Sequence, residues 1–294
     1  MNLLSIVTPT YNRSALLRRC FDSLCAQTNN RFEWIIVDDG STDETAQTAA
    51  AFQREKRDMP IRYVYKENGG KHTALNAAHP LISGDMVLIL DSDDWLLPTA
   101  VEEIFRGWEQ HNDSDIGAVI FLKGYAADDP FARGLREHVP FDMYREYTKT
   151  VHSRDFCDVF RAEAFKRFPF PVFEGERFLS ESVLWNQMAP EYKIVYINKV
   201  LYLAQYLEDG LTKSGRAMRI RAPRGGMLAA DQYMDMRCSV KLRFKNGLLY
   251  NCYSYFAGEP AKAVLHASRA PALAVLTRPG GWILYRYWKR KYGS

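Results

Sequence analysis

The sequence has little cysteine and no long apolar run, and each absence excludes a class of protein. Its five cysteines are scattered and form no Cys-x-x-Cys pair, so we expect neither a disulfide framework nor a thiolate zinc site. No stretch reaches the length of a transmembrane helix, and the N-terminus does not read as a basic and then apolar signal peptide. We therefore expect a cytoplasmic protein of a reducing compartment.

Acidic residues are scarce in the last part of the chain. The 294 residues carry a net charge of +4, but residues 212–294 hold sixteen Lys and Arg against three Asp and Glu. The rest of the chain is therefore acidic. A basic segment of this kind favours an anionic contact, such as nucleic acid, a membrane surface or a substrate phosphate.

Short apolar runs alternate with helical patterns through the first 125 residues. The expected strands cover residues 3–8, 34–37, 61–65, 86–90 and 118–122. The expected helices include residues 17–24, 41–56, 73–79 and 98–108, with a capping box at Ser41 and Glu44 and a first-turn proline at Pro98. This alternation predicts an α/β fold with a mostly parallel sheet flanked by helices.

The pattern changes after residue 125. Residues 126–155 are polar and predict an irregular connection, followed by a helix near 181–188 and a strand over 194–203. From residue 213 the chain is basic and helical in tendency. We expect one domain over 1–211 and a basic helical C-terminal extension over 212–294.

Acidic side chains follow two of the expected strands directly. Asp38 and Asp39 come after one strand, and the run Asp91-Ser92-Asp93-Asp94 comes after another. The carboxyl ends of parallel strands meet at one sheet edge, where ligands bind, so both groups should belong to one site. Crowded carboxylates suit a hard divalent ion, Mn²⁺ or Mg²⁺, whose open positions take phosphate oxygens. The alternative for the second run is a solvated turn that caps a helix.

Other residues near these strand ends give weaker indications. Asp39 could accept a hydrogen bond from a base imide or a ribose hydroxyl. Gly69 and Gly70 before Lys71 allow a close backbone approach to a ligand, with a cation available for phosphate, although paired glycines more often form a turn.

Four ordered motifs carry a resemblance. They are Val7-Thr8-Pro9-Thr10-Tyr11-Asn12-Arg13, Ile36-Val37-Asp38-Asp39-Gly40-Ser41-Thr42-Asp43, Gly70-Lys71-His72-Thr73-Ala74-Leu75-Asn76 and Leu90-Asp91-Ser92-Asp93-Asp94. The series resembles family 2 glycosyltransferases of the GT-A, Rossmann-like fold, over about residues 3–110. A looser likeness through 173–181 and 206–212 is to bacterial members that build capsule, O-antigen or wall polysaccharides.

The resemblance implies transfer of one sugar from a nucleotide-sugar, usually UDP-linked, with inversion at the anomeric carbon. The donor pocket would be lined by Thr8, Pro9, Tyr11, Asn12, Asp39, Lys71, Asn76, Asp91 and Ser92. Asp93 would be the main metal ligand, with Asp91 toward the diphosphate and Asp94 supporting either. The acceptor would be a saccharide or a polyprenol-linked sugar.

Inversion needs a general base for the acceptor hydroxyl. Many family members carry Glu-Asp at the start of a helix, where this chain has Glu181-Ser182. We expect Glu181 to be the base, with Glu176 or Asp158 as alternatives; otherwise Glu181 is only a helix-terminal carboxylate favoured by the macrodipole. The Gln-x-x-Arg-Trp run of processive synthases is absent, which favours single-sugar addition.

The C-terminal stretch 279–292 mixes Trp and Tyr with Lys and Arg. It predicts peripheral contact with the inner face of the cytoplasmic membrane, or else a helix packed on the body. Two other functions stay open: a sugar-1-phosphate nucleotidyltransferase, and a non-catalytic binding or scaffold subunit that has lost its base. Nucleic-acid binding is not expected, because no recognised module is present.

Overall fold

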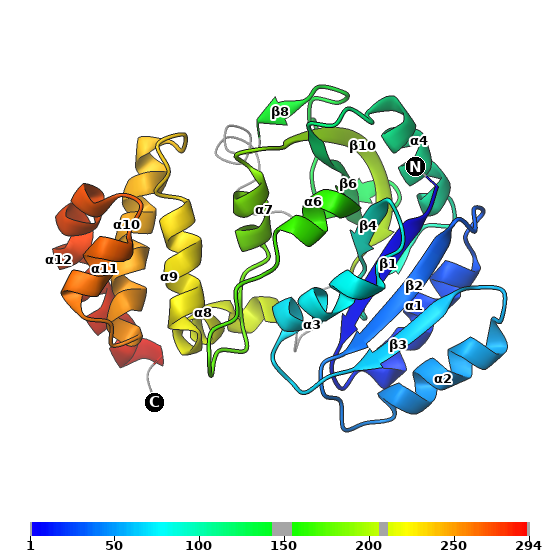
Figure 1. The fold of residues 1–294 in the computed structure, drawn as a ribbon, viewed down its shortest axis with the longest axis horizontal. Helices are drawn as coiled ribbons and strands as arrows, with labels where there is room; N and C mark the ends of the chain where they lie inside the picture. Colours follow the sequence, from blue (N-terminus) through cyan, green and yellow to red (C-terminus); the bar gives the residue numbers. More distant parts are fainter. Residues whose placement is uncertain (1, 143–154, 206–210, 293–294) are drawn as a thin grey trace. The chain divides into compact units, whose positions relative to one another are not determined.

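The computed structural model describes residues 2–142, 155–205 and 211–292 (Figure 1). These residues form two compact units. The first contains residues 2–142, 155–169 and 188–205, and the second contains 170–187 and 211–292. Part of the loose motif at 206–212, residues 206–210, lies outside the described residues. The expected division between residues 211 and 212 stays a prediction.

The first unit is built on one mixed sheet. Its strands are β1 (Leu4–Thr10), β2 (Phe32–Asp38), β3 (Ile61–Tyr65), β4 (Met86–Ile89), β5 (Trp95–Leu96), β6 (Ile116–Ala126), β7 (Asp129–Pro130), β8 (Phe141–Asp142), β9 (Phe156–Arg161) and β10 (Lys193–Leu203). They run in the order β3-β2-β1-β4-β9-β6-β10-β5, with β7 beside β6 and β8 beside β10.

The long strands are mostly parallel, as the sequence predicts. Strand β1 pairs in parallel with β2 and β4, β2 with β3, and β6 with β10. Every residue of β1 and β2 is buried, as expected of strands covered on both faces. Strand β9 is the exception, since it lies antiparallel between β4 and β6. The carboxyl ends of the parallel strands therefore share one edge.

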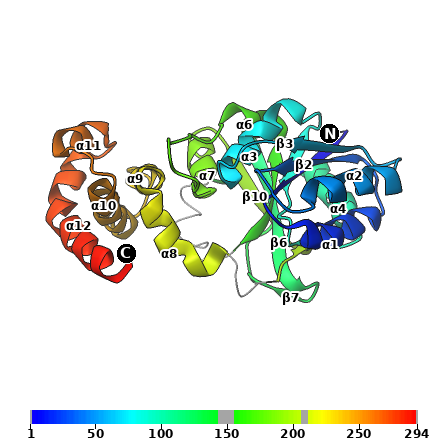
Figure 2. The same cartoon turned by 90° about the horizontal axis from the view of Figure 1, so that it is seen from below.

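Helices cover this sheet (Figures 1 and 2). They are α1 (Ser14–Cys25), α2 (Thr45–Glu55), α3 (Lys71–Ala78), η1 (His79–Leu81), α4 (Ala100–Gln110) and α6 (Ala162–Arg167). Helices α1, α2 and α4 share one apolar core with the sheet, in which Phe21 and Phe52 stack at 4.2 Å between ring centroids and Trp34 lies beside both. Helix α3 contacts β1 and β2, and α6 contacts β4 and β9.

Two expected helix starts are wrong. Helix α2 begins at Thr45 rather than Ser41, because the Ser41 hydroxyl accepts a hydrogen bond from the Asn12 amide while Asp43 accepts from the Thr45 amide and hydroxyl. Helix α4 begins at Ala100, so Pro98 precedes its first turn. The segment expected to be irregular up to residue 155 contains β7 and β8, and β9 was not anticipated.

The second unit is helical after residue 211. Its helices are α8 (Leu211–Arg221), α9 (Pro223–Gln232), α10 (Val240–Phe256), α11 (Ala261–Ala267) and α12 (Pro271–Tyr292); residues 182–187 of α7 (Ser182–Met188) also belong to this unit. Helix α10 packs between α9 and α12. A Cβ on Gly281 would lie 2.4 Å from the Cβ of Asn251, so α12 and α10 approach closely because Gly281 has no side chain.

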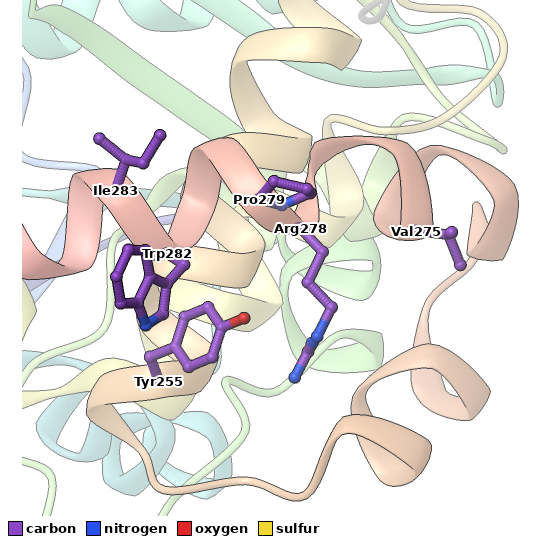
Figure 3. A pocket seen from close by; sticks show the side chains of 6 residues that line it. All are labelled: Tyr255, Val275, Arg278, Pro279, Trp282 and Ile283. Carbon is purple, nitrogen blue, oxygen red and sulfur yellow. The ribbon is translucent and has the colours of Figure 1, made fainter.

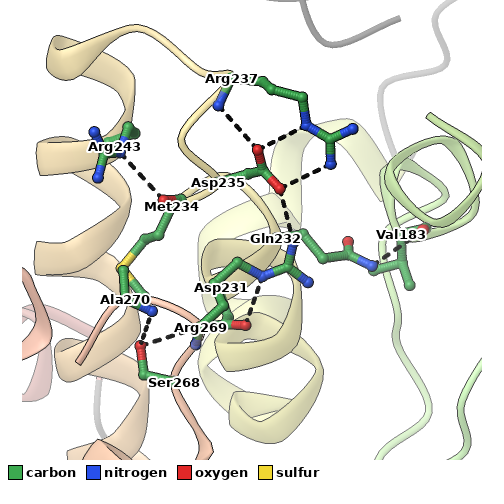
Figure 4. Close-up of polar contacts among 10 residues, drawn as sticks. All are labelled: Val183, Asp231, Gln232, Met234, Asp235, Arg237, Arg243, Ser268, Arg269 and Ala270. Carbon is green, nitrogen blue, oxygen red and sulfur yellow. Dashed lines mark hydrogen bonds and ion pairs between the residues drawn. The ribbon is translucent and has the colours of Figure 1, made fainter. Parts of the chain in front are cut away.

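Polar contacts join the connections between these helices (Figure 4). The carboxylate of Asp231 accepts from the Arg269 backbone amide and from its guanidinium, both at 3.0 Å. Asp235 pairs with Arg237 at 2.9 Å. The two bonds of Asp231 hold the end of α9 to the segment between α11 and α12. In the described part of the chain, no helix is both long and apolar enough to cross a membrane.

Candidate active site

The loop after β1 is tied to the loop after β2. Asn12 has a positive φ of 51°, its amide donates to the Ser41 hydroxyl at 2.8 Å, and its side-chain oxygen accepts from the Thr42 amide at 2.7 Å. Tyr11 beside it is 47% exposed. The two loops that follow neighbouring strands are thus fixed together, with one aromatic ring accessible to a ligand.

Two predicted pocket residues lie within the sheet. Thr8 is fully buried, and its hydroxyl accepts a hydrogen bond from the indole of Trp34 at 2.8 Å. Pro9 is buried in β1 opposite Val37 of β2. The Thr8 hydroxyl therefore joins two strands, and the accessible part of this motif begins at Tyr11.

Asp39 fixes the turn that begins α3. Its carboxylate, almost wholly buried, accepts from the Lys66 ammonium at 2.7 Å, the Gly69 amide at 3.0 Å and the Gly70 amide at 2.7 Å. Gly70 has a φ of 95°, a conformation that favours glycine. Lys71, the first residue of α3, is placed directly after this turn.

The acidic run follows β4, and its first and third residues pair with cations. Asp91 forms an ion pair with Lys71 at the start of α3. Asp93 forms an ion pair with Arg13, which follows β1, and its carbonyl accepts from Arg19 of α1. The side chains of Asp91 and Asp93 are about a third and a fifth exposed, so solvent or a ligand can reach both.

Behind the run lies a buried polar group. Asp94 is 7% exposed; Tyr202 of β10 donates to it and accepts from the Asp91 amide at 2.9 Å. The Lys123 ammonium lies 4.0 Å from the Asp94 carboxylate and 3.9 Å from the centre of the Tyr202 ring. Ser92 is also buried. This group fixes the backbone that carries Asp91 and Asp93.

Burial and charge act in opposite directions on these carboxyls. Burial raises the pKa of Asp94 to about 7, and Lys123 only partly offsets it. Burial also opposes ionisation of Asp91, but Lys71 and Lys123 outweigh it and lower the pKa of that carboxyl. At neutral pH Asp91 is therefore a carboxylate, while Asp94 titrates near neutrality.

The sequence predictions missed Lys123, Tyr202 and Arg19. The sequence contains one signal for Lys123, which is that this cation interrupts an apolar run. A cation near the end of a buried strand needs an acidic partner, so the interruption could have predicted the contact with Asp94. Tyr202 lies 111 residues from Asp91 in the chain. Asn76 lies in the last turns of α3, where its carbonyl accepts from the His79 amide.

The three candidate bases lie in different surroundings. Glu181 is exposed just before α7, and its carbonyl accepts from the Leu184 amide at 3.0 Å. Glu176 is buried, and both carboxylate oxygens accept from the amides of Arg224 and Gly225 at 2.8 Å, which holds the first turn of α9. Asp158 is half-buried in β9 opposite Ile120. Glu176 thus has a structural role, which leaves Glu181 and Asp158 as candidates.

A divalent metal ion at this sheet edge would need oxygen ligands from the protein or from a substrate. Across residues 2–142, 155–205 and 211–292, no group of three or more His, Cys, Asp or Glu is arranged to hold an ion. Asp91 and Asp93, which are separated by Ser92 in the chain, offer partly exposed carboxylate oxygens that are each paired with one cation. Mg²⁺-type sites commonly use one or two carboxylates plus substrate phosphates. The residues therefore fit an ion that is completed by a phosphate ligand.

Comparisons with known proteins agree on one family. The family model for glycosyl transferase family 2 matches residues 5–169. The glycosyltransferase GlyA of Streptococcus pneumoniae is 27% identical over 225 residues, which are 71% of this chain and 31% of that protein. The chain thus spans about a third of the length of that relative.

A second relative is matched over most of its length. The GalNAc(5)-diNAcBac-PP-undecaprenol beta-1,3-glucosyltransferase of Campylobacter jejuni is 26% identical over 265 residues, covering 87% of this chain and 81% of that protein.

Two solved structures share the fold. S. aureus TarS 1-349 in complex with UDP-GlcNAc has a TM-score of 0.65 at 17% identity, covering 99% of this chain and 91% of that one. The mannosyltransferase PcManGT of Pyrobaculum calidifontis, in complex with GDP-Man and Mn²⁺, has a TM-score of 0.59 at 19% identity, covering 98% and 82%.

Proposed function

The chain belongs to glycosyl transferase family 2 and has the GT-A fold, and we propose that it transfers one sugar from a UDP-sugar to a saccharide or lipid-linked acceptor, with inversion. The transfer would serve the synthesis of a bacterial surface polysaccharide. One relative, the Campylobacter jejuni glucosyltransferase that is named for an undecaprenol-linked substrate, supports this kind of acceptor.

The acidic run with its paired cations carries this proposal. Asp91 and Asp93 are partly exposed at the sheet edge and are paired with Lys71 and Arg13. A diphosphate entering here would meet both cations, which can exchange a carboxylate partner for a phosphate oxygen. The carboxylates released by that exchange are then free to hold a metal ion. The two cations would thus bind the negative diphosphate, and the two carboxylates would bind the positive metal ion.

We assign the metal ion to Asp93, with Asp91 as the second protein ligand. A bound Mn²⁺ or Mg²⁺ would act as a Lewis acid that neutralises charge on the departing diphosphate. Asp94 lies behind these two residues in contact with Tyr202, and burial raises its pKa to about 7. Its part in this proposal is to hold the turn that presents Asp91 and Asp93.

The nucleoside half of the donor would lie over the loops that follow β1 and β2. Tyr11 offers an exposed ring for a base or ribose, and Asn12 and Ser41 fix the two loops to each other. Asp39 holds the turn before Lys71, which orients that ammonium toward Asp91.

Inversion proceeds by one in-line displacement. The acceptor oxygen attacks the anomeric carbon as the bond to the diphosphate breaks, and a carboxylate takes the proton from the acceptor hydroxyl. We assign this proton to Glu181, which is exposed before α7. Removing a general base typically costs about 10²–10⁴-fold in rate.

The first experiment measures binding of nucleotide-sugars to the purified chain by calorimetry, with and without Mn²⁺. We expect UDP-sugars to bind, and Mn²⁺ to tighten binding. Asp93→Asn should remove the effect of Mn²⁺, whereas Asp22→Asn, the same change at an exposed α1 position paired with Arg18, should not. If nucleoside diphosphates fail to bind under any condition, the proposal is wrong.

The second experiment follows release of UDP with a polyprenyl-diphosphate-linked saccharide as acceptor. Glu181→Gln should slow release about 10²–10⁴-fold while UDP-sugar binding is kept. Glu174→Gln, which changes an exposed carboxylate of the same segment, serves as the control. If Glu181→Gln keeps full activity, Glu181 is not the base and Asp158 is the remaining candidate. A wild-type chain that binds the donor but never transfers would indicate a non-catalytic subunit.

A further inference from the structure

Helix α12 presents an apolar face to solvent. The face, which we call the α12 face, consists of Val275, Leu276, Pro279, Trp282 and Ile283. These residues recur at spacings of three and four and so lie on one side of the helix. Leu276 and Ile283 are 69% and 64% exposed. Single exposed apolar side chains are ordinary, but a continuous row along several turns marks an interaction surface.

The opposite side of α12 already packs within its own unit. Ala274, Thr277, Gly281 and Trp288 are buried there, and Trp288 packs against Tyr253 of α10 with ring centroids 5.9 Å apart. This side fixes α12 to α10. The exposure of the α12 face therefore follows from the packing of the helix and does not arise because the helix is detached from its unit.

A shallow cavity of about 630 Å³ opens on this face (Figure 3). Its lining consists of Tyr255, Val275, Arg278, Pro279, Trp282 and Ile283. Arg278 is the cation of this lining; it donates to the Asn251 side chain at 3.3 Å and lies 5.0 Å from the centre of the Tyr255 ring. Apolar walls with a cation at their side suit a ligand that has both an apolar part and a negative charge.

The charge around the face has one sign. Between Pro260 and Tyr292 the chain holds seven Lys and Arg and no Asp or Glu. Arg286 and Arg290 continue the α12 face toward its C-terminal end, and Arg286 lies 5.6 Å from the centre of the Trp282 ring. The preceding acidic residue, Glu259, is in an ion pair with Arg224.

We propose that the α12 face docks on an anionic lipid bilayer, with the helix lying in the interface. Leu276, Trp282 and Ile283 would enter the boundary between headgroups and acyl chains, where Trp is favoured. Arg278, Arg286 and Arg290 would meet the phosphate groups. Docking of a second copy on the same face would bring two basic surfaces together and is disfavoured by repulsion.

The experiment measures co-sedimentation of the full chain with vesicles. One set is phosphatidylcholine alone, and the other is phosphatidylcholine and phosphatidylglycerol in equal parts. We expect binding to the anionic vesicles that weakens as salt is added, because salt screens the attraction. Arg286→Gln with Arg290→Gln should weaken binding about 25-fold, since each cation near an anionic surface contributes a factor of about five.

A second variant tests the apolar part of the contact. Trp282→Ser with Ile283→Ser should weaken binding to the anionic vesicles at least about tenfold, because two apolar side chains no longer enter the bilayer. The matched controls are Lys241→Gln with Lys245→Gln, and Val240→Ser, which change exposed cations and an exposed apolar residue of α10. These controls should bind as the unmodified chain does.

Light scattering and circular dichroism accompany each sample and show whether it is folded and monomeric. Binding that is equal for both vesicle types, or equal in all variants, would overturn the proposal. The proposal would also be overturned if the chain forms a dimer in solution, and if Trp282→Ser with Ile283→Ser converts that dimer to a monomer without changing vesicle binding. The α12 face would then be the contact surface for a second copy of the chain.

Discussion

The substitution Asp39→Asn tests whether this carboxylate acts mainly on the protein or mainly on a nucleotide. In the structure it accepts three hydrogen bonds, from the Lys66 ammonium and from the amides of Gly69 and Gly70, and it is 4% exposed. An asparagine has one acceptor oxygen, so at least one of these donors would face an NH₂ group. The negative charge opposite Lys66 would be lost as well.

These losses set the expected magnitude. A buried hydrogen bond to a charged group contributes about 1.5–3 kcal/mol, and an unsatisfied donor left behind adds to the cost. We expect Asp39→Asn to lower the free energy of unfolding by about 2–4 kcal/mol. Because the turn at Gly70 places Lys71 beside Asp91, UDP should also bind more weakly in the folded variant.

Urea unfolding followed by circular dichroism measures the first effect, and calorimetry with UDP measures the second. The matched control is Asp22→Asn, whose carboxylate forms a solvent-exposed ion pair with Arg18 and should therefore change the stability little. If Asp39→Asn is as stable as this control while the preference for uridine is lost, the role inferred from the three hydrogen bonds is wrong and the carboxylate binds the base.

Three further outcomes are expected. Lys71→Gln should weaken UDP binding about tenfold or more in calorimetry, because a charged partner of the diphosphate is removed; unchanged affinity would contradict its placement in the site. Gly281→Ala should lower the free energy of unfolding in urea by about 1–3 kcal/mol, because the new Cβ would lie 2.4 Å from that of Asn251, whereas Gly215→Ala, with open space around it, should not. Burial lowers the pKa of His72, so the unfolded chain takes up the proton first and stability should fall as the pH drops below about 6.5. His72→Gln should make this fall shallower, and an unaltered profile would exclude His72 as its source.

The long parallel strands were predictable because their signal is local, whereas the antiparallel β9 was not anticipated. Most residues of β1, β2 and β4 are apolar, and residues 61–65 form β3 as expected. The start of α2 was not predictable from spacing alone. Ser41 and Glu44 have the positions of a capping box, but Asn12, which lies 29 residues earlier, donates its amide to the Ser41 hydroxyl. A contact between two loops decided the helix start.

The candidate site was likewise predictable from the sequence only in part. The run Asp91-Ser92-Asp93-Asp94 was recognisable because it follows an apolar strand, and the order of the motifs predicted that Asp39 and Lys71 lie near it. The pairing of Asp94 with Tyr202 and Lys123 depends on β6 and β10 reaching the same sheet edge. No spacing in the sequence encodes that approach, because the partners belong to strands separated by long connections.

The central place of β9 has a consequence for how the chain is made. Strands β1 to β4 can pair with one another soon after they leave the ribosome, but β6 is hydrogen-bonded to β9 and β10, which are synthesised later. Until residues 156–161 emerge, β4 and the apolar β6 each present an unpaired edge, and such edges pair readily with other chains. Slow translation between residues 126 and 156 would prolong this exposure. We therefore expect the nascent chain to be most prone to pairing with other chains before the antiparallel strand has been synthesised.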